Sequence, residues 1–310
     1  MRTVFRPQSL TRALSWDMPF VPAAETDLRK ASESMKNWTQ PWTTGIYGDC
    51  GGGSRELIGT GLLLVMNGGL FLLTARHVVE KGRQAKYVSI VCSDGLSAVM
   101  NTSHWELSTP TLDLAACCLG SVSSLTPATL GVVASSSSAV ADHHLFVHGF
   151  PGARSRFTAF FGNQVVSDSV PYLTYLASAE APTDWKEEGE FHPTKHFLID
   201  YPAPEHLQID QTGAPIALPN PAGMSGSAVW ELAKDLTFWK VPQSRIVGIA
   251  IRWDPITQTL VVTRVEEVRT FLLEVLWRRS SYFRWLNAGR PAGTALQDWL
   301  SAKETVTQLQ

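Results

Sequence analysis

The sequence predicts an all-β protein that ends in helices, and two observations support this. Short apolar runs bounded by Gly, Pro and Ser recur through the middle of the chain, among them "GLFLLTA", "KYVSIVC", "HLFVHGF" and "RIVGIAI". Such runs are typical of a barrel or sandwich rather than of alternating strands and helices. From Val265 the pattern changes, because Val265, Val268, Leu272 and Val275 fall at helical spacing. We therefore expect strands up to about residue 264 and helices beyond it.

The strand-rich region is expected to divide at Ser135 to Ser138, a run without periodicity that is either a linker or an ordinary long loop. A short amphipathic helix is expected from about Glu25 to Asn37. The predicted organisation has four parts: an N-terminal extension (1–44), a first β-barrel (45–138), a second β-barrel (139–264), and a C-terminal helix with a helical hairpin (265–310).

One apolar stretch, Leu57 to Ala75, carries no charged residue and has the length of a membrane span. Asn67-Gly68-Gly69 interrupts it, and this sequence favours a type I′ hairpin turn. We expect two short strands there and no contact with a membrane. No sustained apolar region of signal-peptide length precedes Asp17, so we expect a cytoplasmic protein.

The composition limits which kinds of binding partner are expected. The 310 residues are 44% hydrophobic and 17% charged with a net charge of -2, so no broad basic surface is expected to bind nucleic acid. The four cysteines match no zinc-ligand spacing and are expected to be small core residues. His143, His144 and His148 are expected to have surface or packing roles. Neither a metal nor another cofactor is predicted.

The stretch "NPAGMSGSAVW" raises the question whether Ser225 is a nucleophile. A serine hydroxyl needs a base to activate it. All eight histidines precede Ser225, and Ser227 stands at the last glycine position of G-x-S-x-G, so the α/β-hydrolase order is excluded. A subtilisin order could use Asp49 and His77, but the surrounding short strands do not predict a parallel sheet.

The remaining order is histidine, acid and serine. His77 follows an apolar strand in "FLLTARHVVE", and Asp113 opens the apolar run "LDLAACCLG". A carboxylate buried at a strand end needs a partner such as an imidazole N–H, and this pairing sets the tautomer that a general base requires. Asp94 and Asp142 are alternative acids, and we favour Asp113.

The motifs "GTGLLL", "TARHVV", "LDLA", "GMSGSAVW" and "IVGIAI" together resemble the trypsin-like (chymotrypsin-fold) serine peptidases over about residues 45 to 275. The resemblance implies a double β-barrel whose cleft joins His77 and Asp113 of the first barrel to Ser225 of the second. It further implies an endopeptidase that works through an acyl-enzyme, with the N–H groups of Gly223 and Ser225 forming an oxyanion hole.

Met224 departs from the digestive members of this family, which have an aspartate at that position to receive a newly cut N-terminal amine. No "IVGG" activation sequence occurs upstream. Activation by that salt bridge is therefore not expected. The bacterial and viral branches also lack it, which favours a bacterial, cytoplasmic protein.

Substrate contacts are expected on two segments. Pro219 and Asn220 would lie near the base of the specificity pocket, and a strand containing Ala250, Ile251 and Trp253 would form one wall and pair with the substrate backbone. No acid is present at the expected base, which argues against cleavage after Arg or Lys. The small Ala250 and bulky Trp253 favour small or medium apolar side chains.

The tail from Tyr282 to Ala302 is similar to a short two-helix domain of unknown function found in bacterial proteins. It is expected to be either a helical hairpin packed on the barrel or a site in residues 281–310 where a regulatory protein docks. We favour the packed hairpin, and the two tryptophans of this short segment suggest docking as the alternative. For the whole chain, the alternative to a protease is a catalytically silent protease-like module that binds a peptide or partner.

Overall fold

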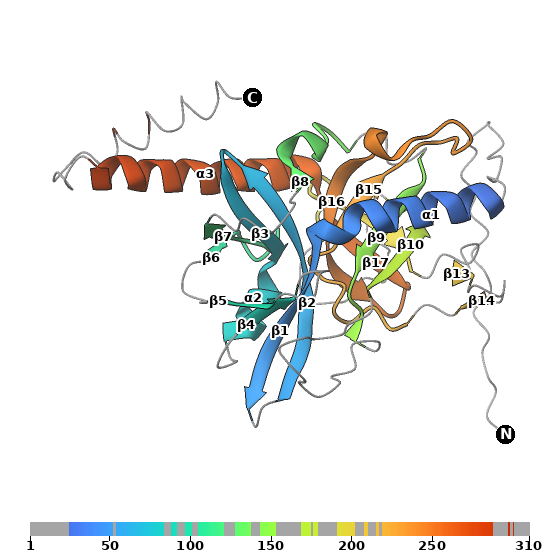
Figure 1. Ribbon diagram of the computed structural model, residues 1–310, viewed down its shortest axis with the longest axis horizontal. Helices are drawn as coiled ribbons and strands as arrows, with labels where there is room; N and C mark the ends of the chain where they lie inside the picture. The colour runs from blue at the N-terminus through green and yellow to red at the C-terminus, as the bar shows by residue number, and fades with distance from the viewer. Residues whose placement is uncertain are drawn as a thin grey trace.

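The computed structural model contains two antiparallel β-sheets that lie side by side, with helices α1 and α3 packed on them (Figure 1). The structure describes residues 25–51, 54–83, 88–91, 97–100, 105–120, 128–137, 143–152, 169–174, 176–178, 191–201, 208–209, 215–216, 219–287, 297 and 300.

The first sheet has the strand order β5-β4-β1-β2-β3-β7-β6, and β8 pairs in parallel with β2 off this path. Its helix α2 follows β3 directly. The bounds are β1 (Thr43–Gly51), β2 (Ser54–Met66), β3 (Gly69–Ala75), α2 (Arg76–Arg83), β4 (Val88–Val91), β5 (Ser97–Met100), β6 (Trp105–Leu107), β7 (Leu114–Gly120) and β8 (Ala128–Thr129).

The second sheet has the order β10-β9-β15-β16-β17-β12-β11, and β13 and β14 pair separately. All of its neighbouring strands are antiparallel. The bounds are β9 (Leu145–Gly149), β10 (Val170–Thr174), β11 (Leu176–Ser178), β12 (His196–Asp200), β13 (Gln208–Ile209), β14 (Pro215–Ile216), β15 (Ala228–Glu231), β16 (Arg245–Asp254) and β17 (Thr259–Arg264). Two antiparallel sheets in tandem make up the chymotrypsin-like double β-barrel, so the predicted fold class is confirmed.

The apolar stretch at the centre of the first sheet is a hairpin, as predicted. Met66 pairs with Gly69, which leaves Asn67 and Gly68 as a two-residue loop. Both have positive φ angles, 48° and 75°, and a type I′ turn requires this at its two central positions. Within the described residues, no helix combines the length and the apolar character that a membrane span needs.

Helix α3 (Val265–Asn287) begins where the helical spacing predicts and follows β17 without a break. It contacts β7 of the first sheet as well as β16 and β17 of the second. Its predicted inward residues Val265, Val268, Leu272 and Val275 are all buried. The predicted helix end at Gly289 and most of the second tail helix lie outside the described residues.

The chain passes from the first sheet to the second between β8 and β9. A short 3-10 turn (Leu130–Val132) follows β8, and Val133 bridges to Ile246 of β16. Within the expected serine linker, Ser137 is buried and donates its backbone N–H to Glu266 of α3. The domain limits expected from the sequence stay a prediction.

Helix α1 (Glu25–Thr39) starts at the expected residue, runs two residues further than predicted, and packs against β9 and β10 (Figure 1). Met35 is fully buried on this face, and Trp38 and Trp42 contact Trp230 of β15, with ring centroids 5.3 and 5.7 Å from it. One core cluster therefore includes side chains from α1, α3 and both sheets.

Beneath α1, His148 of β9 is buried and hydrogen-bonded to Thr39, with 2.8 Å between Nδ1 and Oγ1. Because the Thr39 hydroxyl donates to the Met35 carbonyl, it accepts the Nδ1 proton of His148. Burial lowers the pKa of His148 to about 3, and the nearby Lys36 acts in the same direction. His148 is therefore neutral in the folded protein.

We expect this histidine to make the fold sensitive to acid. The unfolded chain takes up a proton on His148 near pH 6.5, whereas the folded protein does so only near its pKa of about 3. Its contribution to stability is complete above pH 6.5 and decreases by about 1 kcal/mol for each pH unit as the pH falls toward 3. Urea unfolding of the wild type and His148→Gln across this range should give curves that converge in acid. Parallel curves would contradict the assignment.

Candidate active site

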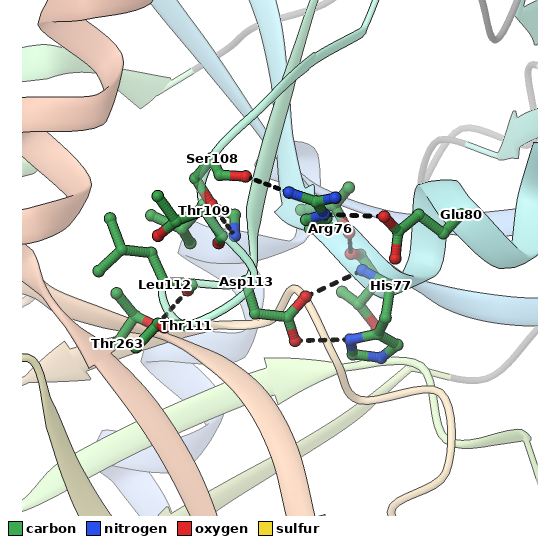
Figure 2. A network of polar contacts seen from close by, with 12 residues as sticks. Arg76, His77, Glu80, Ser108, Thr109, Thr111, Leu112, Asp113 and Thr263 are labelled. Atoms are coloured by element: carbon green, nitrogen blue, oxygen red, sulfur yellow. Dashed lines mark hydrogen bonds and ion pairs between the residues drawn. The ribbon is translucent and has the colours of Figure 1, made fainter. Parts of the chain in front are cut away.

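His77 and Asp113 lie at the junction of β3, α2 and β7. His77 is the second residue of α2, and its Nδ1 lies 2.7 Å from Asp113 Oδ2 (Figure 2). The other carboxylate oxygen accepts the backbone N–H of His77 at 2.9 Å, at a helix start where N–H groups lack intrahelical partners. A carboxylate can only accept from the ring, so Nδ1 carries the proton and Nε2 keeps its lone pair. This is the tautomer of a general base.

Asp113 is held in a strained turn at the start of β7. Its φ angle is 51°, in the left-handed region that few residues other than glycine adopt, and its side chain is buried. Within the turn, the N–H of Asp113 donates to the Thr109 carbonyl, and its own carbonyl accepts from the N–H of Arg76. The carboxylate therefore has little freedom to turn away from His77.

Two side chains of the second sheet also hold this turn. Thr263 of β17 donates its hydroxyl to the Leu112 carbonyl at 2.8 Å (Figure 2). His196 of β12 accepts the N–H of His192 at Nδ1, so its Nε2 donates to the Thr111 carbonyl at 3.0 Å. Burial lowers the pKa of His196 to about 4, so it serves here as a neutral donor.

The backbone carbonyls of the segment that carries Ser225 are all hydrogen-bonded. Each of the five consecutive carbonyls of residues 221–225 accepts a hydrogen bond. In chain order, the donors are Met224 N–H, Gly152 N–H, the Thr60 hydroxyl, Ser227 N–H and Thr60 N–H. Every peptide plane in this segment is therefore anchored on its oxygen side.

Some N–H groups of this segment have a hydrogen-bond acceptor and others do not. Ala222 donates to Asn220 Oδ1, Met224 to the Pro221 carbonyl, and Gly226 to the Ala250 carbonyl. Within the described part of the chain, the N–H groups of Gly223 and Ser225 have no acceptor. Two donors two residues apart are thus left available in a backbone that is otherwise fully bonded.

Gly223 and Gly226 are needed for this shape. Their φ angles are 97° and 94°, which side chains rarely allow. A Cβ atom on Gly226 would lie 1.9 Å from the Thr60 carbonyl oxygen, and one on Gly223 would lie 2.6 Å from the Phe150 carbonyl oxygen. The segment can lie against the first sheet only because these side chains are missing.

Met224 is fully buried in the apolar cluster of the second sheet. A Cβ on Gly149 would approach its sulfur to 2.9 Å, which shows how tightly β9 packs against it. The position before Ser225 is therefore held by apolar burial.

Ser225 and His77 line one cavity of about 320 Å³. No hydrogen bond joins the Ser225 hydroxyl to His77 among the described residues, and such contacts are often long when no substrate is bound. The His77 side chain is 45% exposed, so it is accessible from solvent. The other residues that line the cavity are Pro221, Ala222, Ala250, Ile251, Arg252, Trp253 and Leu260.

Of the five residues expected to contact the substrate, three line this cavity and two do not. Ala250, Ile251 and Trp253 line it as expected, whereas Pro219 and Asn220 do not. Pro219 accepts a hydrogen bond from the Tyr201 hydroxyl, and the Asn220 side chain caps the following turn. Pro221 and Ala222 take the expected place of this pair, because counting residues back from Ser225 cannot foresee that turn.

The sequence reasoning also missed residues that face or support the site. Leu260 and Arg252 line the cavity, and the apolar-polar pattern of their strands gives no sign of it. Thr60 holds the Ser225 segment, and the only sequence signal was its place between two glycines in "GTG".

The other residues noted in the sequence have packing roles where the structure describes them. His143 pairs with Glu231, and His144 and His148 are buried. Cys117 is buried, and burial raises its thiol pKa to about 11. The side chains of Cys50 and Cys92 and the alternative acids Asp94 and Asp142 lie outside the described residues. Over the described chain, no cluster of three or more His, Cys, Asp or Glu side chains could hold a metal.

We expect Gly226→Ala to be strongly destabilising. The substitution forces a side chain onto a φ of 94° and against the Thr60 carbonyl, and such strain costs about 1–3 kcal/mol. Gly131→Ala is the matched control, because a Cβ on that exposed glycine would meet the Thr129 hydroxyl at an ordinary contact distance of 3.6 Å, and its φ is not positive. Urea denaturation should show a large loss of unfolding free energy for the first variant and a change of about 0.5 kcal/mol or less for the second. Equal stabilities would contradict the described geometry.

Comparison with solved structures found chymotrypsin-fold proteases. The active form of the Rv3671c protease of M. tuberculosis is 17% identical, with a TM-score of 0.46, over 87% of this chain and 93% of that chain. The inactive form of a serine-to-alanine mutant of Rv3671c from M. tuberculosis H37Rv is 16% identical, with a TM-score of 0.45, over 89% of this chain and 99% of that chain. The tobacco vein mottling virus protease is 9% identical, with a TM-score of 0.42, over 74% of this chain and 78% of that chain.

Sequence comparisons add a finding at the tail. Residues 278–308 match a family described as a protein of unknown function (DUF2934). The match covers the segment that resembles a two-helix domain, and its first ten residues belong to α3. No curated protein matches the chain. Docking of a regulatory partner on residues 281–310 stays a prediction.

Proposed function

We propose that the protein is a serine endopeptidase with the triad His77, Asp113 and Ser225. The observation that carries the proposal is the pair of unused N–H groups on Gly223 and Ser225 beside the cavity that Ser225 shares with His77. Donors that point at a developing negative charge are what an acyl-transfer site needs. A segment with only a structural role would have no reason to leave two of its N–H groups unbonded.

In the proposed reaction, Ser225 Oγ attacks the carbonyl carbon of the scissile peptide while His77 Nε2 takes the hydroxyl proton. The carbonyl oxygen becomes negative and accepts the N–H groups of Gly223 and Ser225. The C–N bond then breaks, the leaving amine receives the proton from His77, and water hydrolyses the ester by the same steps. Asp113 keeps the imidazole oriented and stabilises its positive charge.

The free edge of β16 beside the cavity supports a peptide as the substrate. Up to Ala250, β16 is bonded on one side to β15 and to Ser227, and beyond that point β17 is its only strand partner in the described chain. The freed edge passes the cavity, so an extended peptide could add to it as a further strand. The proposed substrates are one or a few proteins.

The alternative is a silent protease-like module that binds a peptide without cleaving it. No hydrogen bond joins the Ser225 hydroxyl to His77 among the described residues, and a reactivity test separates the two possibilities. A fluorophosphonate probe forms a covalent bond to an activated serine and leaves an unactivated one unmodified.

We expect the wild type to be labelled by a fluorophosphonate on Ser225, and Ser225→Ala and His77→Ala to lose labelling. Mass spectrometry of the tryptic peptide that carries the adduct measures this directly. Ser227→Ala is the matched control, because the Ser227 hydroxyl is buried two residues away and has no hydrogen-bond partner in the described chain. It should be labelled like the wild type. Failure of the wild type to react would favour the binding module.

The proposed preference is for a small or medium apolar side chain before the scissile bond. Pro221, Ala222 and Ala250 leave room in the cavity, whereas Trp253 and Leu260 restrict it. None of the described residues that line the cavity is acidic, so a Lys or Arg side chain would be desolvated there without a counter-charge.

We expect new protein termini in cells expressing the wild type, relative to Ser225→Ala, to follow small or medium apolar residues. Leu260→Ala should shift the preference toward larger residues such as Phe, because it removes a buried side chain from the cavity lining. Ile256→Ala, on the exposed turn between β16 and β17, is the control and should keep the wild-type preference. Cleavage mainly after Lys or Arg would refute the proposed pocket.

A further inference from the structure

Thr60 of β2 forms hydrogen bonds with backbone groups outside its own sheet. Its hydroxyl donates to the Gly223 carbonyl at 2.8 Å and accepts the N–H of Phe150 at 2.9 Å. Its backbone N–H donates to the Ser225 carbonyl at 2.8 Å. Thr60 thus bonds three backbone groups in the segments next to β9 and β15 of the second sheet.

The position of the Gly223 carbonyl matters for the two unused donors. The Gly223–Met224 peptide, whose oxygen Thr60 holds, lies between the peptide that carries the Gly223 N–H and the peptide that carries the Ser225 N–H. A rotation of this central peptide would turn both neighbours. Of the carbonyls of residues 221–225, only that of Gly223 is held by a side chain.

The surroundings leave Thr60 no freedom to move. Thr60 is completely buried, and the hydroxyl of Thr74 on β3 donates to its carbonyl at 2.6 Å. That same carbonyl lies against the Cα of Gly226, since a Cβ there would come within 1.9 Å of it. Thr60 is therefore a rigid support that the first sheet provides for the segment.

We propose that Thr60 is a positioning residue of the oxyanion hole: its hydroxyl sets the peptide plane between the two donor N–H groups, so that both face the cavity. This inference rests on the proposed function and deepens it. Thr60 touches no substrate and acts through the backbone of Gly223. A misalignment of about 1 Å in such a site can reduce the reaction rate about 100-fold.

Thr60→Val tests the hydroxyl, because valine keeps the shape of threonine and cannot donate to the Gly223 carbonyl. Thr60→Ser keeps the hydroxyl and removes a methyl group. Thr174→Val is the matched control for structural loss, since Thr174 of β10 is equally buried and also loses a hydroxyl, which donates to the Asp200 carbonyl and not to the Ser225 segment. Circular dichroism and urea midpoints establish which variants are folded at the assay temperature.

The measurement is the rate of phosphonylation by a fluorophosphonate, separated into its maximal rate constant and its half-saturating concentration. In this reaction the Ser225 oxygen bonds to phosphorus, fluoride leaves, and the hydroxyl proton passes to His77. The phosphoryl oxygen occupies the place of the oxyanion, so the maximal rate constant reports on the two N–H donors.

We expect Thr60→Val to lower the maximal rate constant about 10-fold to 100-fold with little change in the half-saturating concentration, and Thr60→Ser and Thr174→Val to stay within about threefold of the wild type. A folded Thr60→Val that reacts at the wild-type rate overturns the proposal, and so does a Thr60→Ser as slow as Thr60→Val. If Thr60→Val does not fold, Thr60→Ala, which also cannot donate to the Gly223 carbonyl, replaces it with the same expectation. A wild type that does not react overturns the proposed function and this inference together, whereas the other two results overturn the inference alone.

Discussion

The arrangement of the site depends on hydrogen bonds that cross between the two sheets in both directions. The first sheet holds the Ser225 segment through Thr60, and the second sheet holds the Asp113 turn through Thr263 and His196. Each sheet thus positions the functional side chains of the other. Because a packed core joins the sheets, neither half can shift without breaking bonds in the other half.

This reciprocal support explains how a short backbone segment keeps two donors unbonded. An unpaired N–H at a folded surface is a loss of stability, which the rest of the segment offsets. Its carbonyls are all bonded, Met224 is buried in the apolar cluster of the second sheet, and Gly226 packs on Thr60. The donors are therefore in place before a substrate arrives, and no new N-terminal amine is needed to order Met224. Control of such a protein would have to act on access to the cavity or on its partners.

The cavity itself is shaped by the bulky ends of β16 and β17. Trp253 and Leu260 pair across these strands, so both side chains stand at the same depth. On the opposite side the segment before Ser225 contributes only Pro221 and Ala222. The cavity therefore has one bulky wall and one small wall, and none of the described residues that line it is acidic.

Much of the fold and the order of the candidate site were determined by the sequence alone, because they depend on local patterns. Asn67 and Gly68 dictate their turn by backbone preference, Val265 begins a helix by its spacing, and His77 follows a strand whose apolar run is unmistakable. Because no histidine follows Ser225, the sequence alone also excluded the α/β-hydrolase order.

Only the tertiary structure decided which groups meet. The Asn220 side chain bonds the N–H of Ala222, and this turn moves Pro219 and Asn220 out of the cavity lining. Thr60 reaches Gly223 across 163 positions of sequence, so no pattern of neighbouring residues could reveal the contact. Hydrogen bonds within a turn or helix follow from local preference, whereas bonds between two sheets depend on how both cores pack. The positions of the donors beside Ser225 belong to the second kind.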